Sequence, residues 1–247
     1  MNELKIFGQK IKPTSVRTLA QMQKVIYDKK WLQKEKPALS TPLYYMYREV
    51  IKNQEDKKIS QEYKIRYDIT VMPPFMLGRE FVKTKGHYHP LVTEKFTYPE
   101  LYEVLAGEAI FLLQKKKDKK EIIDDVVAIN RKQGEKLLVP PNYGHIIINP
   151  KDKKLITANL VSSKFSSLYR EIEEMNGFCY FALKNSSEIK WEKNPRYKSV
   201  PFLRFTNQGI PLGSKIYKTK HIYDLINTPS SLDFLNNPQD YLDLWEK

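Results

Sequence analysis

At residues 83–90 the chain reads Lys83-Thr84-Lys85-Gly86-His87-Tyr88-His89-Pro90, which holds two of its four histidines. Residues i and i+2 of an extended strand point to the same face, so His87 and His89 present two imidazoles to one point in space. Such a pair forms half of a metal site on a β scaffold, although two solvated surface histidines would show the same spacing. The rest of the sequence decides between these two interpretations.

A third histidine, His145, supplies a further ligand for such a site. It follows the turn-rich run at residues 139–144 and precedes three isoleucines at 146–148, so a turn leads into a strand at this point. Among the carboxylates between the histidine pair and His145, Glu94 and Glu100 are the near candidates for a ligand. Three imidazoles and one carboxylate form a set that suits Fe, Mn, Ni, Co or Zn.

The composition limits the classes of molecule that the chain is expected to bind. Its 247 residues allow one large domain or two small ones, and its net charge of +13 favours an anionic partner. We find no nucleic-acid-binding motif and no run of about 18 apolar residues, so we expect neither nucleic acid nor a membrane as partner. One cysteine, Cys179, excludes an intrachain disulfide framework. Residues 1–5 lack the apolar core of a signal peptide, and we therefore expect a soluble, cytoplasmic protein.

The hydrophobic pattern predicts one helix followed by many strands. Thr14 and Ser15 resemble an N-cap, and apolar residues then recur at helical spacing through about Trp31. Short runs rich in Tyr, Val, Ile and Phe follow, and they favour a sandwich or barrel over βαβ repeats. The predicted strands are 43–47, 63–72, 81–84, 101–105, 109–114, 122–129, 136–139, 146–148, 155–161 and 178–184.

The C-terminal part of the chain differs from the rest. Thr228-Pro229 is typical of a helix start, and we expect a helix through Leu235 and another from Asn237-Pro238 to about Trp245. We therefore divide the chain into a domain at 1–200 and an extension at 201–247. The apolar residues of the extension need burial, so we expect it to pack on the barrel or on the partner in a homodimer.

The ligand spacing matches the two motifs of the cupin superfamily. The second motif is reproduced by Gly134, Pro140, His145 and Asn149, with Asn142 where a glycine is usual. Asparagine is among the residues that best replace glycine at left-handed backbone angles. In the first motif six residues separate Glu100 from Gly107, whereas Glu94 finds Leu101 at that distance. We therefore expect Glu100 to be the fourth ligand, with Glu94 as the alternative.

The chain resembles one cupin family, the archaeal-type phosphoglucose isomerases, in several short sequence motifs that occur in the same order from about residue 9 to 200. The most specific motif is Thr84-Lys85-Gly86-His87-Tyr88-His89. The others are Ser15-Val16-Arg17 with Leu19 and Met22, Leu43-Tyr44-Tyr45-Met46-Tyr47, Glu100-Leu101-Tyr102, Val139-Pro140-Pro141 before His145, and Asn194-Pro195-Arg196-Tyr197.

This resemblance implies an all-β cupin barrel, a double-stranded β-helix or jelly roll, with an N-terminal helix and a mostly helical C-terminal extension. It implies catalytic roles for Glu100 and Tyr102. The implied metal ligands are His87, His89, Glu100 and His145; the implied phosphate contacts are Thr70, Thr84, Gly86 and Tyr169; the implied sugar contacts are Tyr44 and Tyr102.

The activity implied by the resemblance is the interconversion of glucose 6-phosphate and fructose 6-phosphate by a homodimer. Each subunit would carry one divalent metal ion, Fe²⁺ in the first place, with Mn²⁺, Ni²⁺ or Zn²⁺ as alternatives. Glu100 would move a proton through a cis-enediol, and a hydride shift is the other route.

Two departures from the family keep other functions open. Ser167 stands where the family commonly has a histidine, and Val161 corresponds to a family tyrosine. The alternatives are isomerisation of another phosphosugar, such as mannose 6-phosphate, and a sugar-phosphate-binding cupin with little catalysis.

Overall fold

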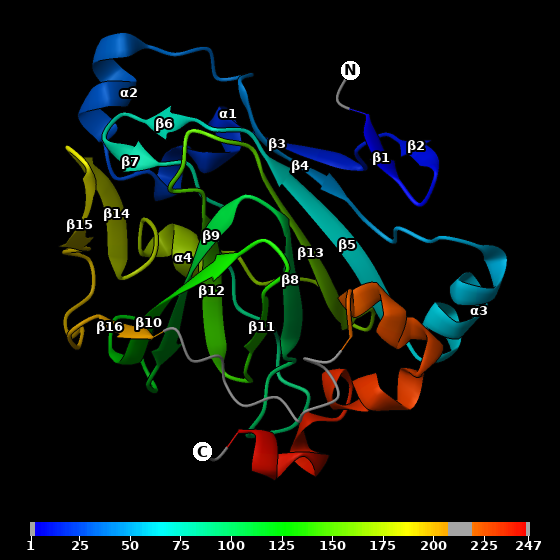
Figure 1. Ribbon diagram of the computed structural model, residues 1–247. Helices are drawn as coiled ribbons and strands as arrows, with labels where there is room; N and C mark the ends of the chain where they lie inside the picture. Colours follow the sequence, from blue (N-terminus) through cyan, green and yellow to red (C-terminus); the bar gives the residue numbers. More distant parts are fainter. Residues whose placement is uncertain (1–2, 207–218, 246–247) are drawn as a thin grey trace.

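The computed structural model describes residues 3–206 and 219–245, and strands form most of its regular structure (Figure 1). Two sheets make up the body of the molecule. The larger sheet has the strand order β11-β8-β13-β5-β4-β3, and the smaller one has the order β12-β9-β10-β16. Apart from the parallel pair β10–β16, neighbouring strands in these sheets run antiparallel. The predicted all-β cupin barrel is therefore confirmed.

The strands of the larger sheet are β3 (Ser15–Thr18), β4 (Pro42–Tyr47), β5 (Ile65–Met72), β8 (Glu100–Ala106), β11 (Lys136–Val139) and β13 (Leu155–Ser162). Those of the smaller sheet are β9 (Glu108–Lys116), β10 (Ile123–Lys132), β12 (Tyr143–Ile148) and β16 (Arg204–Thr206). A further sheet contains β6 (Met76–Leu77), β7 (Glu80–Phe81), β14 (Tyr180–Asn185) and β15 (Glu188–Lys193), and a hairpin contains β1 (Leu4–Ile6) and β2 (Gln9–Ile11).

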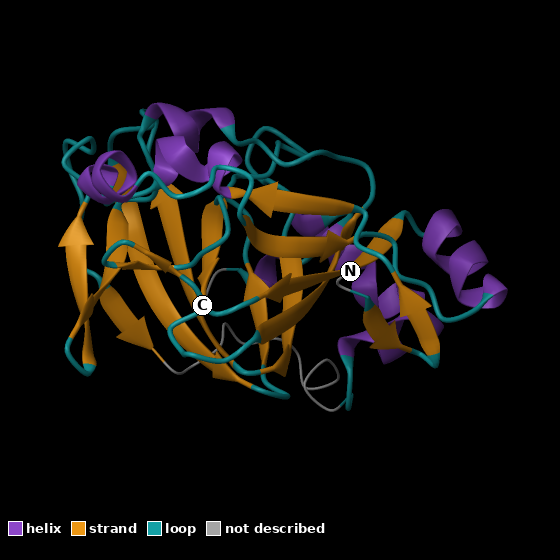
Figure 2. Ribbon diagram, turned by 90° about the horizontal axis from the view of Figure 1, so that it is seen from above, coloured by secondary structure: helices purple, strands orange, loops and turns teal. Residues whose placement is uncertain are grey.

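The larger sheet separates two hydrophobic clusters, because successive side chains of a strand point to opposite faces. On β8, Tyr102 and Val104 belong to the cluster inside the barrel, where they join Phe111 of the smaller sheet. Leu101 belongs to the outer cluster, together with Tyr67 of β5. Viewed from above, most helices lie around the strands and leave the barrel interior to them (Figure 2).

The C-terminal segment covers the outer face of the larger sheet. Its short helices are η2 (Ile222–Asn227), η3 (Pro229–Leu235), η4 (Pro238–Asp240) and η5 (Leu242–Leu244). Ile222 and Phe234 are buried in the outer cluster, which also contains Ile69 of β5 and Leu160 of β13. The orange and red C-terminal segments lie near the lower ends of these strands in Figure 1. Glu103 of β8 accepts hydrogen bonds from the Ile222 amide at 2.7 Å and from the His221 ring at 2.8 Å.

The prediction of helical structure in this extension is confirmed, and its type is 3₁₀, but the predicted single helix from Asn237-Pro238 to about Trp245 is wrong, because η4 and η5 are separate and Tyr241 lies between them. The segment that begins at Pro229 ends at Leu235, as expected, and the segment that begins at Pro238 ends within one turn. The division of the chain at residue 200 stays a prediction, as does the homodimer. Residues 207–218 lie outside the described part of the chain.

The prediction of one helix from Thr14 to Trp31 is wrong. Ser15–Thr18 forms β3, which pairs with β4, and α1 (Leu19–Met22) is a single turn that begins after Thr18. A 3₁₀ turn, η1 (Gln23–Val25), and a separate helix, α2 (Lys29–Glu35), follow. The apolar spacing arose because this segment contributes residues to the barrel core, while the open edge of β4 supplies its backbone hydrogen bonds.

The sequence did not predict helices α3 (Gln54–Glu62) and α4 (Arg170–Glu174), nor the 3₁₀ segment η2. Helix α3 buries only Asp56 and Ser60 within its length, so it lacks the apolar stripe on which the prediction depended. Its N-cap carried the available signal, because Asn53 accepts a hydrogen bond from the Asp56 amide at 2.8 Å. None of the helices in the described part is long and apolar enough to cross a membrane.

Replacing Phe234 by alanine tests the packing of the C-terminal segment. Phe234 is 2% exposed in the outer cluster, so Phe234→Ala should lower the free energy of unfolding by about 3–5 kcal/mol in urea denaturation. Leu242→Ala is the matched control because Leu242 is 43% exposed, and it should change that free energy little. Equal effects of the two changes would contradict burial of Phe234 on the barrel.

Candidate metal centre

The segment that carries the histidine pair is extended, but it is held by isolated bridges and does not form a regular strand. The His145 amide donates to the His87 carbonyl at 3.1 Å, and the His87 amide donates to the His145 carbonyl at 3.4 Å. The Thr84 amide donates to the Ile147 carbonyl at 2.8 Å. On the other side of the segment, Tyr88 and Leu168 exchange two backbone hydrogen bonds. These bonds clamp the histidine pair between β12 and residues near 168.

Gly86 is required for this placement. Its φ of +80° lies in the left-handed region that favours glycine, and a Cβ at this position would overlap Ile146 and lie 2.6 Å from Phe178. Asn142 has a φ of +72°, which confirms the prediction that asparagine takes the left-handed place of the usual glycine. Its side chain also fixes the preceding loop, because its Nδ2 donates to the Lys95 carbonyl at 2.9 Å.

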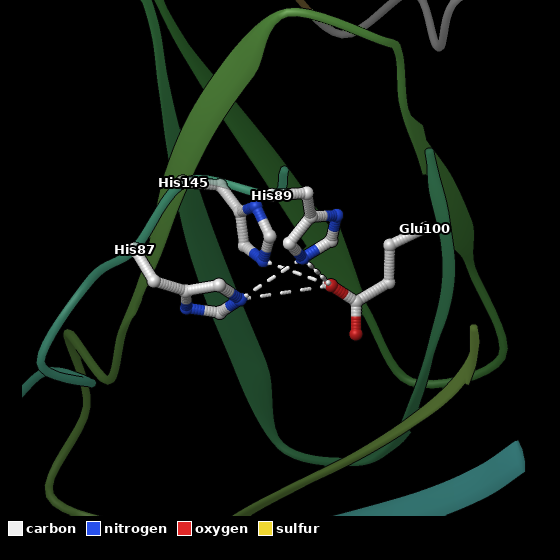
Figure 3. A group of neighbouring side chains, drawn as sticks. All are labelled: His87, His89, Glu100 and His145. Carbon is white, nitrogen blue, oxygen red and sulfur yellow. Dashed lines mark hydrogen bonds and ion pairs between the residues drawn. The ribbon is translucent and has the colours of Figure 1, made fainter. Parts of the chain in front are cut away.

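Four side chains bring their donor atoms to one point (Figure 3). These atoms belong to His87, His89, Glu100 and His145, and all lie within 4.8 Å of one another. The Oε2 atom of Glu100 is 3.1 Å from His145 Nε2, 3.2 Å from His89 Nε2 and 4.0 Å from His87 Nε2. The sequence prediction of these four residues as one group therefore agrees with the structure, and exposed Glu94 is not among them.

The protonation states of the cluster suit a cation. Burial, followed by the neighbouring His145 and His89, lowers the pKa of His87 well below its usual value. Burial also lowers the pKa of His145. Burial by itself would raise the pKa of Glu100, but the close His145 and His89 imidazoles outweigh it and hold that pKa well below its usual range. A low pKa at Glu100 favours its ionised carboxylate, and low pKa values at His87 and His145 favour their neutral imidazoles, and these are the forms that bind metals.

The orientation of the rings provides an independent test of the fit. His89 Nδ1 lies 2.8 Å from the Tyr98 carbonyl, a contact that requires a proton on Nδ1. The Nε2 lone pair of a neutral His89 then points to the centre, where His87 Nε2 lies 3.1 Å away. A cation at the centre would accept this lone pair. The donor set therefore fits a metal ion, and the ring is oriented as in other histidine metal sites.

A cavity opens beside the cluster and contains the other residues predicted from the sequence. Its walls include all six predicted contacts, namely Tyr44, Thr70, Thr84, Gly86, Tyr102 and Tyr169. Ser167 and Val161, the two departures from the family pattern, also line it. The structure thus brings every predicted site residue to one place, while the roles assigned to them stay predictions.

Hydroxyl groups and cations meet at one side of this cavity. The Tyr44 hydroxyl accepts hydrogen bonds from Arg17 Nε at 3.2 Å and from the Lys85 amide at 3.1 Å. The Arg17 guanidinium lies 5.4 Å from the centre of the Tyr169 ring, and the Lys85 ammonium lies 5.5 Å from it. The Tyr44 hydroxyl and these two cations, of which Lys85 is ion-paired with Glu173, form a polar wall that suits an anion.

Seven residues that line the cavity were not predicted from the sequence. They are Met46, Arg48, Arg66, Lys85, Ile147, Asn159 and Phe165. Arg66 could have been found from the alternation of side chains along β5. Its neighbour Tyr67 faces the outer cluster, so Arg66 faces the inside of the barrel. A charged residue on the inner face of a barrel strand indicates a polar interior at that point.

Comparison with known proteins adds a family match. The sequence profile described as "Glucose-6-phosphate isomerase (GPI)" matches residues 16–199. A protein of Pyrococcus furiosus named "Glucose-6-phosphate isomerase" is 30% identical over 185 residues, which cover 74% of this chain and 88% of the relative. A protein of Thermococcus litoralis with the same name is 29% identical over 185 residues, 74% of this chain and 87% of the relative.

Solved structures give a weaker likeness. Recombinant oxalate oxidase in complex with glycolate overlaps 51% of this chain and 55% of its own, with a TM-score of 0.38 and 12% identity. That likeness is too distant to bear on fold or function.

Removing one imidazole should weaken metal binding. His145→Ala deletes a buried donor and should lower the affinity for divalent metal by more than about a hundredfold, since even outer partners of a ligand contribute tenfold to a hundredfold. Titration of the metal-free chain with Zn²⁺ measures the change. His221→Ala is the control, because His221 lies outside the cluster, and it should bind as the unchanged chain does. Equal affinity of the His145 variant would contradict the site.

A substitution at Gly86 separates backbone strain from overlap. Gly86→Ala should both destabilise the fold and reduce metal affinity, because the new Cβ displaces the segment that carries His87. Gly8→Ala introduces similar strain at a φ of +73°, but its Cβ meets nothing within 4 Å. Thermal unfolding with parallel Zn²⁺ titration should show loss of metal affinity in the Gly86 variant alone. Retained affinity there would show that the clamp does not position the histidines.

Proposed function

We propose that this chain, which belongs to the glucose-6-phosphate isomerase family, interconverts glucose 6-phosphate and fructose 6-phosphate in the cavity beside the four-residue cluster. The observation that carries this proposal is the meeting of a buried three-histidine, one-carboxylate cluster with a polar, cation-flanked wall in a single cavity. The first of these features suits a metal ion and the second suits a phosphate. An open-chain hexose phosphate presents oxygens to both.

His87, His89, His145 and Glu100 would hold one divalent metal ion, and we propose Fe²⁺, with Mn²⁺, Ni²⁺ or Zn²⁺ compatible with the same donors. When bound, the ion supplies Lewis acidity that stabilises negative charge on O1 and O2 of the open-chain sugar. The phosphate would be held by Thr70, Thr84, Gly86 and Tyr169, with Lys85 and Arg17 supplying positive charge.

Glu100 is the proposed base that moves the proton between C1 and C2 through a cis-enediol. Its Oε2 atom faces the histidines, whereas the other carboxylate oxygen is turned away from them (Figure 3). That second oxygen is free of the histidine contacts and is therefore the atom we assign to proton transfer. Burial, and then the charge of Glu100, raise the pKa of Tyr102 well above its usual value. Tyr102 therefore stays protonated, and we assign it donation of a hydrogen bond to a sugar oxygen.

One observation favours a second candidate, a sugar-phosphate-binding protein with low turnover. Ser167 and Val161 line the cavity, and neither side chain transfers protons readily at neutral pH. The same cavity would accept another phosphosugar, such as mannose 6-phosphate. A homodimer and a cytoplasmic location remain parts of the proposal that follow from the family resemblance.

A coupled assay on the metal-loaded chain tests the isomerase proposal. Glu100→Gln removes the basic carboxylate and should lower kcat at least about a hundredfold, the usual contribution of acid–base catalysis. Glu94→Gln is the matched control and should keep full activity, because exposed Glu94 lies outside the cluster. Absence of turnover by the unchanged chain with Fe²⁺, Mn²⁺, Ni²⁺ and Zn²⁺ would sink the proposal and leave the binding function.

The fate of the transferred hydrogen distinguishes the two routes. If Glu100 shuttles a proton, the reaction in deuterium oxide should incorporate solvent deuterium at C1 or C2, because the acquired proton exchanges with solvent. Mass spectrometry of the product measures this incorporation. Complete retention of the original hydrogen would instead support a hydride shift.

A further inference from the structure

The register of the larger sheet arranges the inner face of the cavity in rows. Across β8, β13 and β5, Glu100 lies opposite Val161 and Val161 lies opposite Arg66. The next inward row is Tyr102, Asn159 and Asp68, and the row after it is Val104, Thr157 and Thr70. Rows of this kind are about 7 Å apart, since they are two residues apart along each strand.

The middle row lies between the two ends of the proposed substrate. Glu100 stands in the first row, at the metal cluster, and Thr70 stands in the third row, among the proposed phosphate contacts. A sugar phosphate with C1 and C2 at Glu100 and its phosphate near Thr70 must therefore pass over the middle row. Asn159 is the central residue of that row.

Asn159 has a polar group without a partner. The residue is 3% exposed, it lines the cavity, and its Nδ2 has no hydrogen-bond partner among the described residues. A buried amide donor left without a partner is destabilising, so such groups are uncommon unless a ligand or water completes them. In the same row the Tyr102 hydroxyl has a partner among the described residues, His145 Nε2 at 3.0 Å, whereas Asn159 Nδ2 has none.

Asp68, on the other side of Asn159, is also fully engaged. Its Oδ2 accepts hydrogen bonds from Arg48 at 2.6 Å and from Arg66 at 2.8 Å, and its Oδ1 accepts one from the Glu49 amide at 2.9 Å. Both arginines line the cavity. One carboxylate between two guanidiniums leaves a positive surplus on the wall beside Asn159.

We propose that the Asn159 Nδ2 donates a hydrogen bond to a hydroxyl oxygen on the middle carbons, C3 or C4, of the open-chain sugar phosphate. This inference rests on the proposed function, because it takes the two ends of the substrate from it. Asn159 then determines specificity: it selects ligands that carry a polyhydroxy chain over anions that offer only a phosphate.

The test uses two probes on the full, Mn²⁺-loaded chain, with affinities measured by calorimetry. Glucitol 6-phosphate has the hydroxyl chain but no carbonyl group, so it binds without being isomerised. Inorganic phosphate offers only the anion. Asn159→Leu should weaken glucitol 6-phosphate about threefold to tenfold, the value of one hydrogen bond, and should leave inorganic phosphate unchanged.

A matched control and a second variant keep the result interpretable. Asn130→Leu removes an amide of β10 that bonds Glu108 away from this cavity, and it should change neither affinity. Asn159→Ser keeps a hydroxyl donor in a smaller side chain, and it serves if the leucine variant does not fold. We expect it to weaken glucitol 6-phosphate as well, with inorganic phosphate again unchanged.

Three outcomes overturn the inference: unchanged binding of glucitol 6-phosphate by both Asn159 variants, equal weakening of both probes, or failure of the unchanged chain to bind glucitol 6-phosphate. Failure of the proposed function is distinct from these. If the unchanged chain binds glucitol 6-phosphate but does not isomerise glucose 6-phosphate, the isomerase proposal falls, and selective weakening by the Asn159 variants still supports the inference.

Discussion

Two backbone hydrogen bonds between His87 and His145 hold together everything the site depends on. They attach an irregular extended segment to β12, and so bring imidazoles from segments about 60 residues apart in sequence to one point. Gly86 allows the close approach, because any Cβ there would overlap Ile146. The barrel supplies Glu100 from the opposite sheet. The metal-ligand cluster is therefore a product of strand pairing, not of any one local motif.

The arrangement also explains why one cavity can serve two ends of a ligand. Thr84 and Gly86 belong to the same short segment as the histidine pair. The same backbone hydrogen bonds therefore position both the cluster and these proposed phosphate contacts. Lys85, between them, forms an ion pair with Glu173 and places its ammonium near the Tyr169 ring. Cations on this wall agree with the net charge of +13, although most of that charge lies elsewhere on the chain.

Sequence could predict the site where spacing alone determines geometry. The i, i+2 pair, the distance from Glu100 to Gly107, and the left-handed position of Asn142 depend on a few neighbouring residues, and the structure agrees with each. Arg48, Asp68 and Asn159 could not be found in this way. Alternation assigns each to a face, but only the register between β5, β13 and β8 makes Asn159 and Asp68 neighbours.

The N-terminal segment is a second case in which local sequence did not predict strand pairing. The apolar spacing after Ser15 fits a helix, yet the free edge of β4 captures Ser15–Thr18 as a strand. The sequence of one segment does not show that it will pair with the edge of a sheet, because that edge is formed by residues farther along the chain. Tertiary hydrogen bonding overrode local periodicity here.

The most direct test of the central claim is a stoichiometric metal titration followed by activity on glucose 6-phosphate. Metal-free chain would be loaded with increasing Fe²⁺ without oxygen, and bound metal and isomerisation rate would be measured on the same samples. If the cluster is the active centre, the rate should rise in proportion to bound metal and level off at one ion per chain. A rate independent of bound metal would contradict the account.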